Sequence, residues 1–320
     1  MMQFLKKICA ALLSAALAAS AAGCAAPEEP VAGRLRIVTT LFPQYDFARQ
    51  LAGERAEVTL LLPPGVESHS YEPTPADIIK IANADLFVYT GQYMEPWAQN
   101  ILDGVEMGGD VLDISTGIVL DPEDHDHAGE TETEHAAHAD HGHGGYDPHI
   151  WTDPVNARQM VQNLADALCA ADPEGEAFYR GNERDYLEAL AALDREFSEI
   201  VSHGKRREIV FGGRFALHYF AERYGLDYTA AFDSCSHETE PSAQVLARII
   251  DTIGRERIPV IYYEELTDPK VARAISEETG AKMLLLHSCH NVSRDELREG
   301  ATYLSLMRQN AENLKEGLNG

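Results

Sequence analysis

The chain has 320 residues, of which 45% are hydrophobic and 24% are charged, a composition typical of a folded globular protein. Its 52 acidic residues outnumber its 26 basic residues, and the formal net charge of -26 argues against binding to nucleic acid. The length predicts two domains of ordinary size.

The N-terminus reads as a targeting segment rather than as part of the fold. A short basic stretch precedes an apolar run over residues 8–22, which is too short to span a bilayer comfortably and ends in the letters AAGC at Cys24. Small residues directly before a cysteine resemble a bacterial lipoprotein signal, and the alternative is an ordinary secretory signal cut near the same place. We expect a lipoprotein signal peptide over residues 1–23, lipidation of Cys24 and a flexible tether over residues 24–33.

The mature chain then alternates strand and helix patterns. Strands are expected at residues 34–40, 57–62, 86–90 and 111–114, with helices at 44–52, at 75–83 and from about residue 96. Such alternation predicts a mostly parallel sheet with helices on both faces. The segment Asp121–Gly145 breaks the pattern, because it holds six histidines, eight acidic residues and no large apolar residue. It cannot bury a core, so we expect a mobile loop.

A long helical stretch follows from residue 154 to about 203, and its second run would be about 40 Å long. A second alternating set has strands at 208–211, 227–232, 259–263 and 282–286, and helices that begin near residues 214, 241, 268 and 293. The fold class is therefore α/β. We predict two lobes with mostly parallel sheets, at residues 34–153 and 204–320, joined by a helical backbone at 154–203. Ligands of open α/β sheets bind beyond the carboxyl ends of the strands, which places the site in the cleft between the lobes.

Histidines stand where that rule places ligands. The candidates, two from each lobe, are His69, His149, His218 and His287. Neutral imidazole is the usual nitrogen donor for zinc, and four donors complete a tetrahedron. A single histidine near a strand end is usually only a polar loop residue, but four at matching topological points predict a metal site.

The segments around three of these histidines are distinctive: "HSYEPTP", "DPHIWTDP" and "GGRFALHYFAERYGL". They resemble the solute-binding proteins of zinc and manganese ABC importers, over nearly the whole mature chain. The resemblance implies two α/β lobes joined by one rigid long helix, with metal ligands at His69, His149 and His218. The fourth ligand of that family is commonly a carboxylate or water, whereas His287 stands at the matching strand end here, with His290 as a nearby substitute. A ligand set without carboxylate favours Zn2+ over Mn2+.

Acidic side chains in the same motif loops are candidates to orient the ligand histidines; they are Glu72, Asp147, Asp153, Glu240 and Glu264. Cysteines stand in two loops of the second lobe, at Cys235 and Cys289. We expect a disulfide between them that pins His287, and some zinc-binding relatives carry a comparable bridge. The alternative is that one or both thiols bind metal.

The acidic loop also resembles zinc-type members of the family. Its histidines are either a low-affinity collector of zinc or part of a solvated linker; they are His125, His127, His135, His138, His141 and His143. The sequence thus predicts a monomeric binding protein without catalysis, held outside the cytoplasm by a lipid anchor. It would capture zinc, with manganese second, for an ABC permease whose separate subunit hydrolyses ATP, since the chain has no phosphate loop. The alternatives are a secreted zinc hydrolase and a surface adhesin on the same scaffold.

Overall fold

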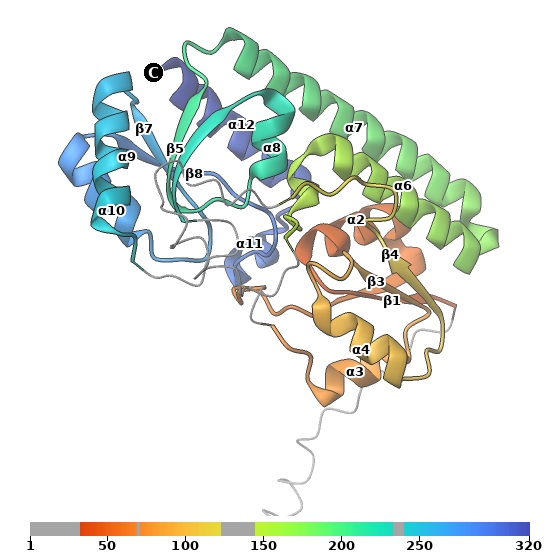
Figure 1. Ribbon diagram of the computed structural model, residues 1–320. Coiled ribbons are helices and arrows are strands. Elements are labelled where there is room, and N and C mark those ends of the chain that lie inside the picture. The colour runs from red at the N-terminus through yellow and green to blue at the C-terminus, as the bar shows by residue number, and fades with distance from the viewer. Residues whose placement is uncertain (1–32, 69–70, 123–144, 233–239) are drawn as a thin grey trace, which may run out of the picture. The chain divides into compact units, whose positions relative to one another are not determined.

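The computed structural model describes residues 33–68, 71–122, 145–232 and 240–320 (Figure 1). The contacts group the chain into two units, Met1–Arg34 and Leu35–Gly320, and every element described below belongs to the second unit. Within the described ranges, no helix combines the length and the apolar character needed to cross a membrane.

Two parallel four-stranded sheets form the framework. The first contains β1 (Leu35–Thr39), β2 (Ala56–Leu60), β3 (Leu86–Tyr89) and β4 (Asp110–Asp113) in the order β2-β1-β3-β4. The second contains β5 (Glu208–Arg214), β6 (Asp227–Phe232), β7 (Val260–Tyr263) and β8 (Lys282–Leu285) in the order β6-β5-β7-β8. The two sheets share one strand order, and the predicted α/β class with two parallel sheets is confirmed.

Helices cover both faces of the first sheet. Successive apolar side chains of its strands point to opposite faces, and both faces are buried. These helices are α2 (Phe42–Ala52), α3 (Pro75–Ala82), α4 (Pro96–Gly104) and α6 (Pro154–Ala171). Ile37 and Val88 face the core that contains α2 and α6, whereas Val38 and Phe87 face a smaller core with residues of α3 and α4. Strands buried on both faces are the expected consequence of parallel pairing.

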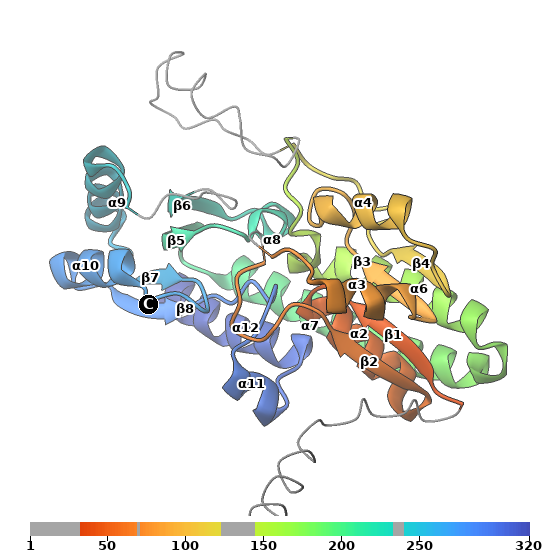
Figure 2. The same ribbon diagram turned by 90° about the horizontal axis from the view of Figure 1, so that it is seen from below.

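The second sheet is covered in the same way. Its helices are α8 (His218–Tyr224), α9 (Ala243–Glu256), α10 (Lys270–Thr279), α11 (Arg294–Glu299) and α12 (Tyr303–Asn319). Val210 and Ile261 face α9 and α10, whereas Ile209 and Tyr262 face the core that contains α8 and α12. Figures 1 and 2 both place α9 and α10 across the sheet from α12.

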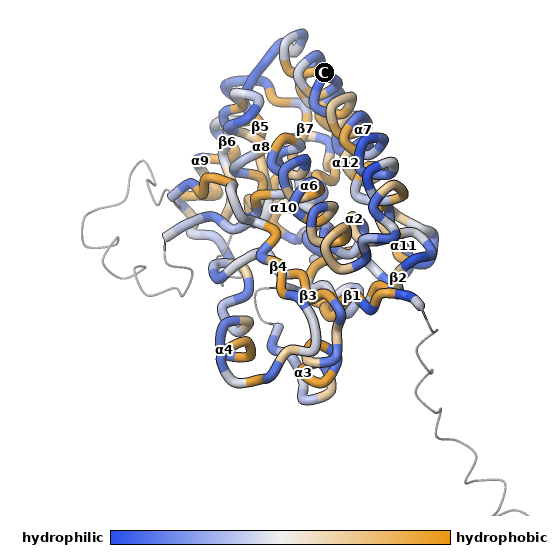
Figure 3. The backbone as a smooth tube through the Cα atoms, turned by 90° about the vertical axis from the view of Figure 1, so that its right-hand side faces the viewer, coloured by the Kyte–Doolittle hydropathy of each residue, from blue (hydrophilic) through white to orange (hydrophobic). Residues whose placement is uncertain are grey.

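The long helix α7 (Glu176–His203) has 28 residues, which corresponds to about 42 Å. It packs against α2, α6, α8 and α12, so it contacts helices from both sheets. Along α7, hydrophilic and hydrophobic residues alternate in the pattern of a helix with one face on a core (Figure 3). The main apolar core is continuous, since it includes Ile37 of β1, Leu190 and Phe197 of α7, and Ile209 of β5. The lobe boundaries at residues 153 and 204 remain predictions.

Two predicted helix boundaries were wrong. The helix expected from about residue 214 begins at His218, because β5 continues through Arg214. Within β5, Gly212 lets the strand lie close to Ala272 of α10, since a Cβ at residue 212 would lie 2.6 Å from the Cα of Ala272. The final helix is divided in two, because Gly300 ends α11 at a φ of 80° and the side chain of Thr302 caps α12.

A buried carboxyl group ties together the carboxyl ends of β1 and β3. Glu95 is 2% exposed, and its side chain accepts hydrogen bonds from the Thr40 hydroxyl and, at 2.9 Å, from the Thr90 amide. The Gln44 amide lies 3.5 Å from the same carboxyl. Burial raises the pKa of Glu95 to about 8, although these hydrogen bonds act in the opposite direction.

This raised pKa predicts a pH-dependent stability. Between pH 4.5 and about 8 the folded protein holds a proton on Glu95 that the unfolded chain releases. The Glu95 contribution to the free energy of unfolding is therefore complete below pH 4.5 and is lost as the pH rises through about 8, by at most about 5 kcal/mol. In urea unfolding at a series of pH values, Glu95→Gln should remove this decline. If the free energy of unfolding changed with pH in the same way in both proteins, the assignment of this decline to Glu95 would be refuted.

Candidate metal centre

A buried histidine lies directly before α6. His149 is 1% exposed, and both its backbone amide and its Nδ1 atom lie 2.8 Å from Oδ1 of Asp147. An ionised carboxylate can only accept hydrogen bonds, so Nδ1 of His149 carries the proton. Its Nε2 then keeps the lone pair, as in metal-bound histidines. Burial raises the pKa of Asp147, but the charge and hydrogen bonds of His149 outweigh it and hold that pKa below its usual value.

Helix α8 brings a second histidine to this loop. The Tyr219 hydroxyl donates to the Asp147 carbonyl at 2.7 Å and accepts from the Asp121 amide at 3.0 Å. His218, the first residue of α8, is the neighbour of Tyr219, and its charge also contributes to the lowered pKa of Asp147. The predicted His149 and His218 therefore lie in one region.

His218 also belongs to a more exposed cluster. Its Nε2 atom lies 4.0 Å from Oδ2 of Asp121 and 3.9 Å from Oε2 of Glu222. Within the described ranges, these residues are the one group of three or more possible metal ligands whose donor atoms all lie within 4.8 Å of one another. We did not predict either carboxylate. The spacing of Glu222, one helical turn after His218, was a readable signal.

The turn after β8 holds two further histidines, and His287 is the more deeply buried. Its Nδ1 accepts a hydrogen bond from the Cys289 amide at 2.9 Å, so in the neutral ring Nε2 carries the proton. The backbone of His287 is clamped by Asn310 of α12, which accepts from its amide at 2.7 Å and donates to its carbonyl at 2.8 Å. Nε2 is buried without a hydrogen-bond partner among the described residues, and Glu296 is 3.8 Å away.

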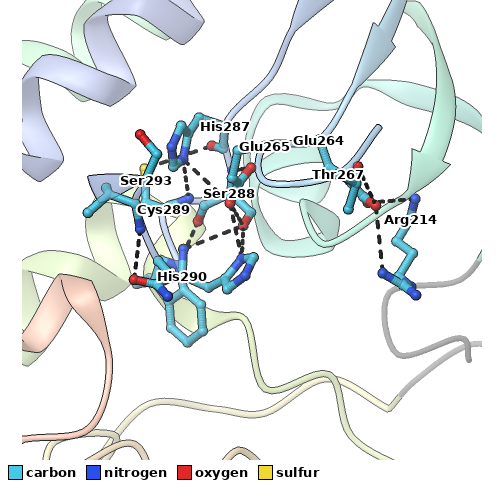
Figure 4. A network of polar contacts seen from close by, with 12 residues as sticks. Arg214, Glu264, Glu265, Thr267, His287, Ser288, Cys289, His290 and Ser293 are labelled. Atoms are coloured by element: carbon cyan, nitrogen blue, oxygen red, sulfur yellow. Dashed lines mark hydrogen bonds and ion pairs between the residues drawn. The ribbon is translucent and has the colours of Figure 1, made fainter. Parts of the chain in front are cut away.

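His290 has the opposite arrangement (Figure 4). Its Nδ1 lies 3.0 Å from Oε1 of Glu265 and 2.6 Å from Oγ of Ser288, and the Ser288 hydroxyl itself donates to Glu265 at 2.6 Å. Nδ1 therefore carries the proton, and the buried Nε2 has no hydrogen-bond partner among the described residues. Burial lowers the pKa of His290, but the Glu265 hydrogen bond and charge outweigh it and raise that pKa overall.

The two histidines share Glu265 as an acidic neighbour and differ in their other acidic neighbours. The acidic groups beside His287, Glu265 and Glu296, both follow β7 in the chain. The pKa of His290 is instead raised in part by Glu67, which follows β2 of the first sheet, and by Glu264. The His290 carbonyl accepts a hydrogen bond from the Phe42 amide at 3.2 Å, so His290 lies beside the first half of the chain, and its Nε2 is the nitrogen left for a ligand.

The other predicted supporting carboxylates have separate roles. Asp153 caps α6 by accepting from the Val155 amide at 2.8 Å, and Glu264 accepts from the Arg214 amide at 2.7 Å. Glu72 and Glu240 are exposed. We missed Glu265, although it is adjacent to the predicted Glu264, because the sequence does not show which of two neighbouring carboxylates points inward.

Cys289 is fully buried, has a positive φ of 64° and has no disulfide partner among the described residues. Burial raises the pKa of this thiol well above its ordinary value. Its predicted partner Cys235 lies outside the described residues, so the disulfide stays a prediction. Other predicted functional residues also lie outside them: His69, Cys24 and the histidines of the acidic loop.

Residues 37–317 match the family model described as zinc-uptake complex component A, periplasmic. The chain is 34% identical to the zinc-binding lipoprotein AdcA of Streptococcus pneumoniae serotype 4, over 98% of the chain and 61% of the relative, so it spans less than two thirds of that protein. It is 33% identical to the high-affinity zinc uptake system protein ZnuA of Bacillus subtilis, over 89% of the chain and 88% of the relative.

Among solved structures, the Zn(II)-bound ZnuA-like domain of Streptococcus pneumoniae AdcA matches with a TM-score of 0.74. It is 31% identical and aligns with 90% of this chain and 100% of the domain. The family is one of zinc-transport binding proteins rather than enzymes, so the hydrolase alternative has no support. The chain belongs to the family of periplasmic zinc-uptake components and is extracytoplasmic.

Proposed function

We propose that the protein captures a zinc ion between its two sheets and delivers it to an ABC importer. The observation that carries the proposal is a repeated arrangement, in which an imidazole is held at Nδ1 by a buried carboxylate. His149 is held in this way by Asp147 before α6, and His290 by Glu265 after β8. This partnership fixes the ring, sets its tautomer and raises its basicity as a metal ligand.

Within the proposed site, His69, His149 and His218 supply three ligands, and the turn after β8 supplies the fourth. The geometry supports His290 over His287 as that fourth ligand. Nε2 has no hydrogen-bond partner among the described residues in either ring. In His287 the Cys289 amide occupies the Nδ1 lone pair, so Nε2 carries the proton, whereas in His290 Nδ1 carries the proton and Nε2 keeps its lone pair. Four neutral imidazoles favour zinc over manganese, which prefers oxygen ligands.

The site also defines the partners that we propose. A monomeric binding protein would dock on a permease, and a separate subunit would hydrolyse ATP. Because the Streptococcus pneumoniae relative is named a lipoprotein and Cys24 follows small residues, we propose that a lipid on Cys24 holds the protein at the cell membrane. The acidic histidine-rich loop would collect zinc weakly near the site.

The fourth ligand can be tested by substitution. His290→Ala should weaken zinc binding by at least about tenfold, whereas His287→Ala should mainly lower the melting temperature of the metal-free protein. Chelator competition at fixed pH measures the affinity, with manganese titrated in parallel. His203→Ala is the control, because His203 is exposed at the end of α7. A larger affinity loss in His287→Ala than in His290→Ala would overturn the assignment.

The role of Asp147 gives a second prediction. Asp147→Asn keeps the size and a carbonyl acceptor but removes the charge that supports His149, so zinc affinity should fall about 10-fold or more. Asp153→Asn is a matched control, since asparagine caps a helix as well as aspartate does. Isothermal calorimetry compares the two variants. Equal zinc affinity in both would show that Asp147 does not act through the metal.

The loop gives a third prediction. Deletion of residues 123–144 should remove weak zinc binding and leave about one tightly bound ion per molecule, because the proposed tight ligands all lie elsewhere. Equilibrium dialysis with metal analysis measures both classes. Loss of the tightly bound ion would show that the ligand set is wrong.

A further inference from the structure

A wholly buried asparagine joins the turn that carries His290 to the first half of the chain. Asn291 is 0% exposed, and its Nδ2 atom donates to the Pro63 carbonyl at 2.9 Å and to the Val66 carbonyl at 2.8 Å. Its Oδ1 atom accepts from the Val292 amide at 2.9 Å. Both donors of the side chain are therefore used on one segment that follows β2.

The residues on either side of Asn291 also form hydrogen bonds with the first half of the chain. The His290 carbonyl accepts from the Phe42 amide at 3.2 Å, and the Val292 carbonyl accepts from the Gly65 amide at 2.8 Å. Residues 290–292 thus form a strap against α2 and the turn that follows β2. Asn291 is the member of this strap that acts through its side chain.

The segment held by Asn291 is a tight turn that leads toward the proposed site. The Val66 amide donates to the Pro63 carbonyl at 3.1 Å, and Gly65 has a φ of 83°, so Asn291 binds the carbonyls at both ends of this turn. Next in sequence come Glu67, whose charge raises the pKa of His290, and Ser68, which is 7% exposed. His69 follows directly in the sequence.

Contacts other than those of Asn291 also hold together the two halves of the protein, each of which contains one sheet. The Asp46 carboxylate of α2 accepts from the Tyr303 amide of α12 at 2.8 Å, and the Tyr303 hydroxyl donates to the Trp151 carbonyl at 2.6 Å. The Trp151 indole donates to the Ser288 carbonyl at 2.7 Å. Because α7 and the continuous core add to these bonds, the loss of Asn291 should move the turn locally rather than separate the halves.

We propose that Asn291 is a positioning residue for metal binding, which sets the distance between His290 and the segment Pro63–Ser68. This inference rests on the proposed function, since it assumes that His290 is a zinc ligand. With Asn291 in place, the turn that carries His290 and the segment that precedes His69 are held at one separation. Without it, the site loosens and accepts other coordination numbers.

Asn291→Ala should lower zinc affinity by about tenfold or more, the range seen when groups that support metal ligands are removed. Co2+ serves as the spectroscopic probe, because tetrahedral Co2+ absorbs visible light far more strongly than six-coordinate Co2+. The absorption per bound Co2+ should fall in the variant. If Asn291→Ala does not fold, Asn291→Ser, which keeps one donor, is held to the same criteria.

Asn163→Ala is the matched control. Asn163 of α6 also donates to two backbone carbonyls, at 3.0 Å to Ile114 and at 2.8 Å to Thr116, within the first half of the chain. Its loss should lower the melting temperature and leave zinc affinity and the Co2+ spectrum unchanged. Equal affinity losses in the two variants, or an unchanged Co2+ spectrum in Asn291→Ala, would overturn the proposal.

A double-mutant cycle with His290→Ala separates this inference from the proposed function. If Asn291 acts through His290, the two substitutions should be strongly non-additive in zinc affinity. Additive losses would reject the positioning role and leave zinc capture intact. Failure of the unaltered protein to bind zinc would instead reject the proposed function itself.

Discussion

The structure depends on one apolar core that runs beneath both sheets and along α7. Each sheet buries one face of its strands in this core, so the sheets are fixed relative to each other by packing and not only by a covalent connection. The histidines can therefore stand at fixed positions although they come from segments far apart in the sequence.

Burying a carboxyl group beside this core is unfavourable unless its charge is removed or stabilised, and two buried glutamates show the two solutions. Glu95 keeps a proton, because its hydrogen-bond partners are neutral and do not compensate the cost of burying its charge. Glu265 is buried to a similar degree, but histidines and Ser288 stabilise its charge and lower its pKa. The difference between these two carboxyl groups lies in their partners, not in their depth.

The alternation of apolar strands and helices was sufficient to predict both sheets, since that pattern is local in sequence. The motif segments placed His149 and His218 in one region, and the structure joins their segments through the His149–Asp147 contact and the hydrogen bond from Tyr219 to the Asp147 carbonyl. The choice between His287 and His290 was beyond sequence reasoning. It depends on which ring nitrogen the Cys289 amide and the Glu265 carboxylate occupy, and those contacts are set by how the turn folds back on β7.

The role of Asn291 was hidden for a similar reason. Its partners are the carbonyls of Pro63 and Val66, which are more than two hundred residues earlier in the chain. Backbone carbonyls leave no signature in the sequence, so a side chain that binds them looks like any other polar loop residue. Only the folded arrangement distinguishes Asn291 from Asn319, which bonds to its own helix.

The length of α7 has a consequence for how a captured ion would leave. Binding proteins that hinge open expose their ligand by a large rotation of one domain on another. A 28-residue helix packed against both halves resists such a rotation, because bending it would break the shared core. Release would then depend on small rearrangements of loops and side chains at the rim, which occur faster than domain motions. A transporter that receives the ion would act on those loops, and the body of the protein would remain as it was.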